Sequence, residues 1–177
     1  MDRLLPLDDA DWPEELADLR SGFAGRLNVY RVMAHHPALL GAWAPLRQHL
    51  VTRSALGAER SEVVILRAAH RMGSPYEWAH HVSRARKLGF SDARIAALAA
   101  TPEAGDALIA RAVDHLFDDR RLPRALEAEL RAAIGHEAVF DLIATVGFYS
   151  ILGYLLMTYE TPLDADIAAE LSASPLG

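Results

Sequence analysis

Apolar residues recur at intervals of three and four positions along most of the chain, as they do on the buried face of an α-helix. A clear example follows Pro37, where the pattern comprises Leu39, Leu40, Trp43, Leu46 and Leu50. Long runs of valine, isoleucine and threonine, which are typical of strands, do not occur. We therefore expect an all-α protein with helices at residues 28–34, 37–54, 58–72, 75–88, 92–101, 103–117, 123–134 and 136–159.

Helix-breaking residues divide the chain into three parts. Prolines and glycines at positions 6, 13, 22 and 25 predict an irregular N-terminal segment at residues 1–24. Residues 25–160 carry the helical periodicity, and residues 161–177 are expected to form a loosely wrapped C-terminal tail. The sequence shows no obvious linker or low-complexity segment, and 177 residues suit one hydrophobic core. The sequence thus predicts a compact single-domain helical bundle spanning residues 1–177.

The break at Gly73 predicts how two of these helices pack. A short connection between the helices on either side of it favours antiparallel neighbours, which makes residues 58–88 a candidate core hairpin. Ser74 suits the N-cap position of the second helix. Glu77 follows three residues later and can return a hydrogen bond to the backbone amide of the cap. A capping box is therefore one complete explanation of Glu77.

Charge and composition exclude several classes of function. The formal net charge is -6 and no predicted face gathers lysine and arginine, so we expect no nucleic-acid partner. The one basic segment, at Arg84, Arg86 and Lys87, is expected to be a solvated helix end. Cysteine is absent, which excludes disulfides, a thiolate nucleophile, cysteine-ligated zinc and thiol peroxidase chemistry within the chain.

One apolar stretch raises the question of a membrane. Residues Leu142 to Met157 carry no charge, but the stretch is shorter than the ~20 residues that span a bilayer. We expect a buried core helix or a subunit interface there, and no membrane partner. The N-terminus has no basic region followed by a long apolar core, so we expect no secretory signal and a cytoplasmic location.

Three polar residues of the candidate hairpin could carry chemistry. Glu77 and His81 are four residues apart and share a helical face, and Glu62 lies near the start of the preceding helix. Two carboxylates and one imidazole are sufficient for general acid/base catalysis. If they are enclosed together, the glutamates are expected to stabilise His81 as an imidazolium.

The same residues carry a resemblance to a known family. Residues 58–90 and the later segment VGFYSILGYLLMTYETPLD resemble the core hairpin and closing helix of the carboxymuconolactone decarboxylase and alkyl hydroperoxidase D-like family. Thiol-active members carry a glutamate, a Cys-x-x-Cys motif some twelve residues later, and a histidine four residues after the second cysteine. In this chain that pattern falls on Glu62, Ser74, Glu77 and His81. Both thiol positions are replaced, so redox cycling through a disulfide is excluded.

The resemblance covers roughly residues 28–165. It implies the helical bundle of the alkyl hydroperoxidase D-like proteins and a homo-oligomer, since members assemble as dimers, trimers or hexamers. In thiol-active relatives the histidine and glutamate form a proton relay that activates a cysteine, and here only the relay positions are retained.

The leading hypothesis is cofactor-free decarboxylation, a carbon-carbon lyase reaction, on a small carboxylated lactone or carbonyl compound. His81 would donate the proton, Glu77 would orient His81, and Glu62 would relay protons to solvent. The neighbouring Ser74, Tyr76 and Trp78 are candidate substrate-binding residues.

Other hypotheses remain open. The same three side chains offer oxygen and nitrogen ligands for zinc, iron or manganese, although the Glu-x-x-His spacing of di-iron bundles is missing and no metal is assigned. The chain could also be a non-catalytic, oligomeric ligand-binding protein, assembled through its apolar last helix. His81 and Glu77 could simply form an ion pair on a helix surface.

Overall fold

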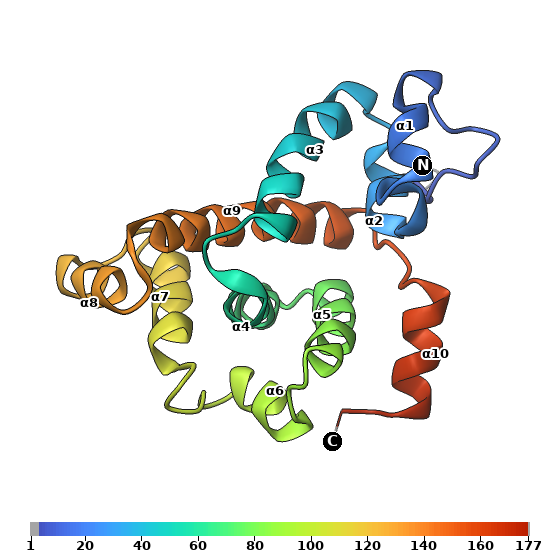
Figure 1. Ribbon diagram of the computed structural model, residues 1–177. Helices are drawn as coiled ribbons and strands as arrows, with labels where there is room; N and C mark the ends of the chain where they lie inside the picture. Colours follow the sequence, from blue (N-terminus) through green and yellow to red (C-terminus); the bar gives the residue numbers. More distant parts are fainter. Residues whose placement is uncertain (1–3, 177) are drawn as a thin grey trace.

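The computed structural model describes residues 4–176, and within this range it consists of helices and loops without a strand (Figure 1). The all-α prediction is confirmed. The elements in chain order are η1 (Glu14–Leu16), α1 (Ala17–Ser21), η2 (Ala24–Arg26), α2 (Asn28–Met33), α3 (Pro37–Thr52), α4 (Gly57–Met72), α5 (Pro75–Lys87), α6 (Asp92–Leu98), α7 (Ala107–Asp118), α8 (Arg124–Ile134), α9 (His136–Thr158) and α10 (Ala165–Ala173).

Helix α4 is the centre of the molecule. Figure 1 views it nearly end-on, with α9 crossing above it and α5, α6 and α7 placed around its other sides. Its run of apolar residues from Val63 to Leu66 is buried without interruption, so apolar side chains leave it in several directions. A helix whose buried apolar side chains leave it in several directions needs neighbouring helices on each of those sides, which agrees with the place of α4 inside the bundle.

The turn at Gly73 produces the predicted helical hairpin. Gly73 has a φ of 66°, in the left-handed region where glycine carries no Cβ penalty, and it ends α4. The backbone amide of Ser74 then donates to the carbonyl of Ala69 at 3.0 Å, which closes the helix end. Helices α4 and α5 pack against one another, as expected for residues 58–88.

Two apolar clusters make up the core, and α9 contributes to both. Val139 and Leu142 belong to the cluster formed with α6, α7 and α8, whereas Phe148 and Leu152 belong to the cluster formed with α2 and α3. Helix α9 is long and apolar enough to cross a membrane by length and composition, but 56% of its most apolar window is buried inside the fold. Its place in the structure is that of a core helix.

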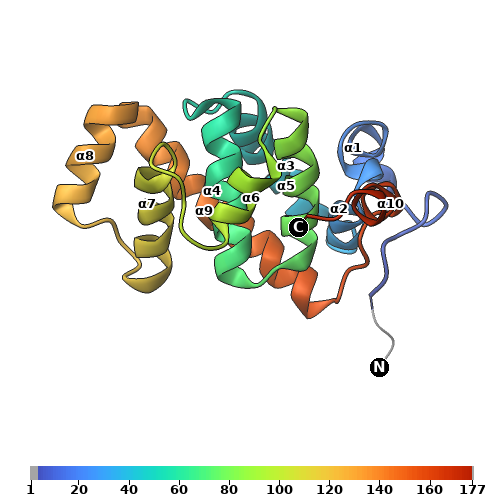
Figure 2. The ribbon, with the colours of Figure 1, turned by 90° about the horizontal axis from the view of Figure 1, so that it is seen from below.

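Both ends of the chain contain more helix than expected. The N-terminal segment forms η1 and α1, where Leu16 is buried; residues 1–3 of the predicted irregular segment lie outside the described residues. The expected loose tail contains α10, which packs on α5 and buries Ile167. Figure 2 shows α10 beside α2 at one end of the molecule, with α7 and α8 at the other. Residue 177 lies outside the described residues.

Candidate active site

A buried pair of side chains joins α4 to α5. The ring Nδ1 atom of His81 lies 2.5 Å from Oε2 of Glu62, and the two residues are only 4% and 2% exposed. A carboxylate accepts hydrogen bonds and does not donate them, so Nδ1 carries the proton in this contact. The Nε2 atom of a neutral His81 ring is therefore left as a proton acceptor.

Glu77 approaches the opposite side of the same ring. Its Oε2 atom lies 3.6 Å from Nε2 of His81, and its Oε1 atom is buried without a hydrogen-bond partner among residues 4–176. The capping-box interpretation is wrong, because Ser74 forms no side-chain cap and its buried hydroxyl has no partner in the described chain. Glu77 lies toward His81 because their four-residue spacing puts both on one face of α5.

The pKa values of the two carboxyl groups are shifted in opposite directions. Burial raises the pKa of Glu77 to about 8, an effect that nearby Arg84 opposes and Glu62 reinforces. Burial would also raise the pKa of Glu62, but His81 and Arg84 outweigh it as charges and hydrogen-bond donors, and the pKa of Glu62 is lowered. Near neutral pH, Glu77 is thus protonated and Glu62 ionised. Two neighbouring acids with pKa values pushed apart are the usual basis of an acid/base assignment.

The environment of His81 also differs from the sequence-based expectation. Burial lowers the pKa of His81, and the Glu62 carboxylate opposes this effect through its charge and its hydrogen bond. The lost hydration of the cation is the larger effect, so the ring is neutral rather than an imidazolium. The prediction that the glutamates would hold His81 charged is therefore wrong.

Arg84 is a residue of the candidate site that sequence analysis missed. Its Nε atom lies 3.1 Å from Oε1 of Glu62, whereas Arg86 and Lys87 pair with Asp92 and Glu170. The expectation of a purely solvated basic helix end is thus wrong for Arg84. The available signal was its position three residues after His81, which places the two on one helical face.

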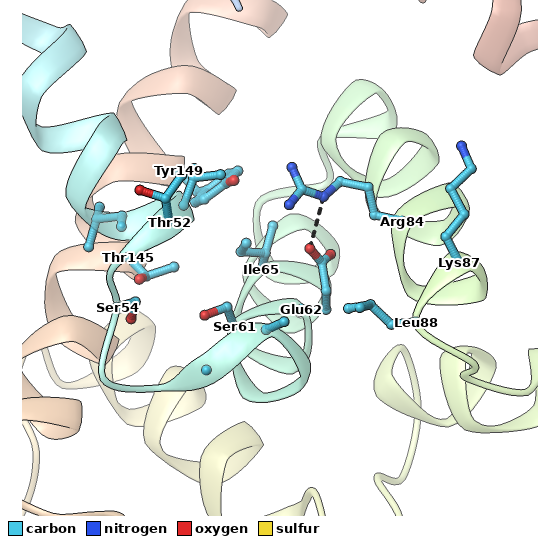
Figure 3. A pocket seen from close by; sticks show the side chains of 14 residues that line it. Thr52, Ser54, Ser61, Glu62, Ile65, Arg84, Lys87, Leu88, Thr145 and Tyr149 are labelled. Carbon is cyan, nitrogen blue, oxygen red and sulfur yellow. Dashed lines mark ion pairs between the residues drawn. The ribbon is translucent and has the colours of Figure 1, made fainter.

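Two cavities adjoin these residues. The larger, of about 410 Å³, is lined by Glu62 and also by the buried Thr145, whose hydroxyl has no partner within residues 4–176. The smaller, of about 200 Å³, is lined by Glu77 and His81. Tyr149 and Arg84 line both cavities, and Figure 3 shows them on opposite sides of the larger one. The three predicted catalytic residues are therefore brought together and enclosed, and they face two cavities that share a wall.

The three predicted substrate-binding residues have different surroundings. Tyr76 lines the 200 Å³ cavity, and its hydroxyl bonds to Asp164. Ser74 lines a separate, mainly apolar cavity of about 400 Å³ between the start of α5 and the end of α9. Trp78 is half-buried against the core, with its ring 6.4 Å from that of His70. Of the three, only Tyr76 lies beside Glu77 and His81.

The geometry bears on the metal hypothesis as well. Within residues 4–176, no group of three or more histidine, aspartate or glutamate side chains is arranged to hold a metal ion. In the candidate site, one oxygen of Glu62 faces His81 and the other faces Arg84. Both oxygens of this carboxylate are thus engaged by protein donors.

Comparisons with known proteins relate part of the chain to a family and its fold to solved structures. The sequence model of the carboxymuconolactone decarboxylase family matches residues 37–118. No curated protein matches the chain by sequence. The fold is similar to that of a cysteine-to-alanine variant of the debrominase Bmp8 in complex with 2,3,4-tribromopyrrole, with a TM-score of 0.78, 15% identity, and coverage of 98% of this chain and 97% of that chain.

Two further solved structures share the fold. An uncharacterised peroxidase-related protein from Silicibacter sp. has a TM-score of 0.77 and 15% identity, covering 94% of this chain and 95% of its own. A protein of unknown function from Agrobacterium tumefaciens, with a provisional assignment as the antioxidant defence protein AhpD, has a TM-score of 0.65 and 17% identity, covering 78% and 97%. Residues 37–118 thus match the carboxymuconolactone decarboxylase family, the chain shares its fold with peroxidase-related and AhpD-like proteins, and its sequence contains no cysteine.

Proposed function

We propose that the protein is a cofactor-free acid/base catalyst that decarboxylates a small carboxylated lactone or carbonyl compound. The observation that carries the proposal is the buried carboxyl of Glu77, which lies 3.6 Å from the ring of His81 beside a cavity of about 200 Å³, and burial raises its pKa to about 8. A carboxylic acid whose pKa of about 8 lies near neutrality can donate a proton to carbon and recover it within one catalytic cycle.

The proposed reaction needs only the side chains of this site. The substrate carboxylate leaves as carbon dioxide, and the electron pair of the broken carbon-carbon bond enters a conjugated carbonyl group. The resulting carbon takes the proton of Glu77, which is left as a carboxylate. A proton from solvent then restores Glu77, and the adjacent Nε2 atom of His81 is placed to pass it on.

These roles revise the sequence-based assignment. His81 was expected to donate the proton and Glu77 to orient it. In the proposal, Glu77 is the donor and Glu62 orients His81, because the 2.5 Å contact of Glu62 fixes the proton on Nδ1. The family match supports the reaction class, and the tribromopyrrole in the debrominase structure supports a small ring compound as ligand of this fold.

The test is Glu77→Gln, assayed for carbon dioxide release with a panel of lactone carboxylic acids and β-keto acids. We expect kcat to fall by about 10²–10⁴-fold, the usual contribution of a positioned general acid. In the wild type, turnover should fall as the pH rises through about 8, where Glu77 loses its proton. The matched control is Glu59→Gln, an exposed residue one turn earlier than Glu62 on α4. Full turnover by Glu77→Gln would overturn the assignment.

A second candidate function is a non-catalytic, oligomeric ligand-binding protein, related to the peroxidases by fold and without thiol chemistry. The exposed apolar side chains of α9 favour it, because they suit assembly and take no part in the site. A wild-type protein that binds members of the panel without releasing carbon dioxide would support this candidate. For either function we propose a cytoplasmic protein.

A further inference from the structure

Four residues line both cavities of the site: Val51, Arg84, Lys87 and Tyr149. Val51 is apolar, and the ammonium of Lys87 is engaged by Ser83 at 2.8 Å and by Glu170 at 3.3 Å. The remaining two, Arg84 and Tyr149, carry hydrogen-bond donors that have no acceptor among the described residues. A ligand that occupies either cavity meets these donors.

Tyr149 brings an unpaired hydroxyl into a buried position. The residue is 5% exposed, and within residues 4–176 its hydroxyl bonds to no other side chain or backbone group. Its ring is held edge-on by His81 and Phe148, with centroids 5.1 and 5.3 Å apart. Burial raises the pKa of the Tyr149 hydroxyl well above its usual value, so it keeps its proton. A hydroxyl that has no protein partner and belongs to a residue lining two cavities is a hydrogen-bond donor available to a ligand.

Arg84 brings a positive charge to the side of the larger cavity opposite Tyr149 (Figure 3). Its Nε atom faces Glu62 at 3.1 Å, while its two terminal nitrogens have no partner among the described residues. Arg47 adds a second guanidinium to the smaller cavity, where it stacks on Phe23 at 3.8 Å and lies 3.3 Å from the Tyr30 hydroxyl. Arg47 has no carboxylate partner in the part of the chain that the structure describes. Tyr149 and the two arginines therefore present hydrogen-bond donors and positive charge to a ligand in these cavities.

We propose that Arg84 and Tyr149 form an oxyanion-binding pair, which binds the substrate oxygen that becomes negative when its carbonyl accepts an electron pair. This inference rests on the proposed decarboxylation and specifies its substrate class. The substrate is a carboxylic acid with a ketone or lactone carbonyl conjugated to the bond that breaks, so that loss of carbon dioxide gives an enolate. The enolate oxygen lies between Arg84 and Tyr149, and Glu77 protonates the enolate carbon.

The pair acts differently on the ground state and on the intermediate. A neutral carbonyl oxygen is a modest acceptor, whereas an enolate oxygen carries charge and binds a guanidinium and a hydroxyl more strongly. Donors fixed in place before the reaction need no reorganisation when that charge appears. Removing one donor of such a pair lowers kcat by about 10²–10³-fold.

A phenol that changes colour on ionisation tests the pair without any turnover. 4-Nitrophenol is a planar ring whose anion mimics an enolate, and its ionised and neutral forms absorb at different wavelengths. We expect the wild type to bind it and to increase its ionised fraction at a pH below its pKa in water. Tyr149→Phe and Arg84→Gln should each reduce this preference for the anion by about tenfold or more.

Matched controls separate this effect from general changes to the surface or fold. Tyr154→Phe alters an exposed tyrosine on the same helix as Tyr149. Arg131→Gln alters an arginine that is half-exposed like Arg84 and also faces a glutamate, Glu127. Both controls should bind the anion as the wild type does. Where Arg84→Gln fails to fold by circular dichroism, Arg84→Lys keeps the charge, loses the planar geometry and should give a partial loss.

Several results would overturn the proposal. A wild type that binds only neutral 4-nitrophenol, or does not bind it at all, would contradict it, as would Tyr149→Phe and Arg84→Gln variants with unchanged anion binding. Failure of the proposed decarboxylation is distinguishable, because probe binding requires no proton from Glu77. Glu77→Gln should therefore retain the ionised probe even if no member of the acid panel is turned over.

Discussion

The carboxyl group of Glu77 is held where it destabilises the folded chain at neutral pH. Its pKa is raised to about 8 by burial, and its Oε1 atom has no hydrogen-bond partner within residues 4–176. An unpaired buried oxygen loses its hydration without compensation. Destabilising groups of this kind are expected at functional sites, where a carboxyl group with a pKa near neutrality can take part in proton transfer.

Replacing Glu77 by glutamine should stabilise the protein in a pH-dependent way. A carboxyl group with a raised folded-state pKa binds its proton more tightly in the folded state than in the unfolded state, where its pKa is near 4.5. The folded state therefore loses stability as the pH rises from about 4.5 to 8, by at most about 1.4 kcal/mol per pH unit. We expect the Tm of Glu77→Gln to exceed that of the wild type increasingly over this range.

The shape of that pH dependence identifies the group. The gain in Tm should be small near pH 5 and should stop growing above pH 8, where folded and unfolded states are both ionised. The Tm of Glu59→Gln, a change at an exposed position, should differ from that of the wild type by an amount that does not vary with pH in this way. A constant offset for Glu77→Gln would mean that Glu77 is ionised in the folded state.

At the scale of single helices, the sequence predicted positions better than it predicted contacts. Gly73 marks the turn of the hairpin, because a left-handed residue there ends α4, and the four-residue spacing put Glu77 and His81 on one face. The sequence could not show that His81 pairs closely with Glu62, since that contact depends on how α4 and α5 cross. The roles of Tyr149 and Arg84 were missed for the same reason.

The tail shows a second limit of sequence analysis. Apolar periodicity is weak after residue 160, yet α10 forms because polar contacts fix its start. Asp164 accepts hydrogen bonds from the Asn28 backbone amide at 3.0 Å, from the Tyr76 hydroxyl and from the His80 ring at 2.9 Å. One carboxylate thus ties α10 to α2 and to α5, a connection between residues more than eighty positions apart in sequence.

Replacing Asp164 by alanine should release α10. The change removes the acceptor of two buried side-chain donors and one backbone amide, which should lower the free energy of unfolding by about 2–4 kcal/mol. Amide hydrogen exchange should then speed up in residues 161–176 before it does in α4. Asp166→Ala, an exposed position in the first turn of α10, serves as control and should cost less than about 1 kcal/mol.

Acidic pH should reduce the difference in the free energy of unfolding between the Asp164→Ala variant and the wild type. Burial would raise the pKa of Asp164, but hydrogen bonds from His80, Tyr76 and the Asn28 amide outweigh it and hold the pKa below 3.8. A carboxylate with a lowered pKa contributes stability above its unfolded pKa and loses it as the pH falls through the folded value. A difference in stability that persists undiminished at strongly acidic pH would contradict this account.

For the molecule as a whole, the site lies where its two apolar clusters meet. Val82 of α5 packs in the cluster with α6, α7 and α8, while Tyr76 of the same helix packs in the cluster with α2 and α3. The side chains of Glu77 and His81 leave α5 between these two positions in sequence. Rigid packing on both sides is what a catalytic pair needs to hold its geometry.

The outer face of α9 carries apolar side chains that neither cluster covers. Phe140 is 63% exposed, Ile143 43%, Ile151 47% and Tyr154 60%, at helical spacing along one side of the helix. A contiguous apolar stripe of this length on a protein surface is typical of an interface. We propose that it pairs with its copy in a second chain, since a stripe on one helix can pack against its equivalent across a two-fold axis.

A charged residue in the middle of this stripe should dissociate the assembly. Ile151→Asp places a carboxylate where the two helices would meet, and an unpaired buried charge costs several kcal/mol, enough to prevent association at micromolar concentration. Light scattering coupled to size exclusion should show an oligomer for the wild type and a monomer for the variant. Leu5→Asp changes another exposed apolar residue, 61% exposed against 47% for Ile151 and far from α9 in sequence, and should leave the mass unchanged. A monomeric wild type would contradict the proposal. The apolar face of α9 would then need a different partner.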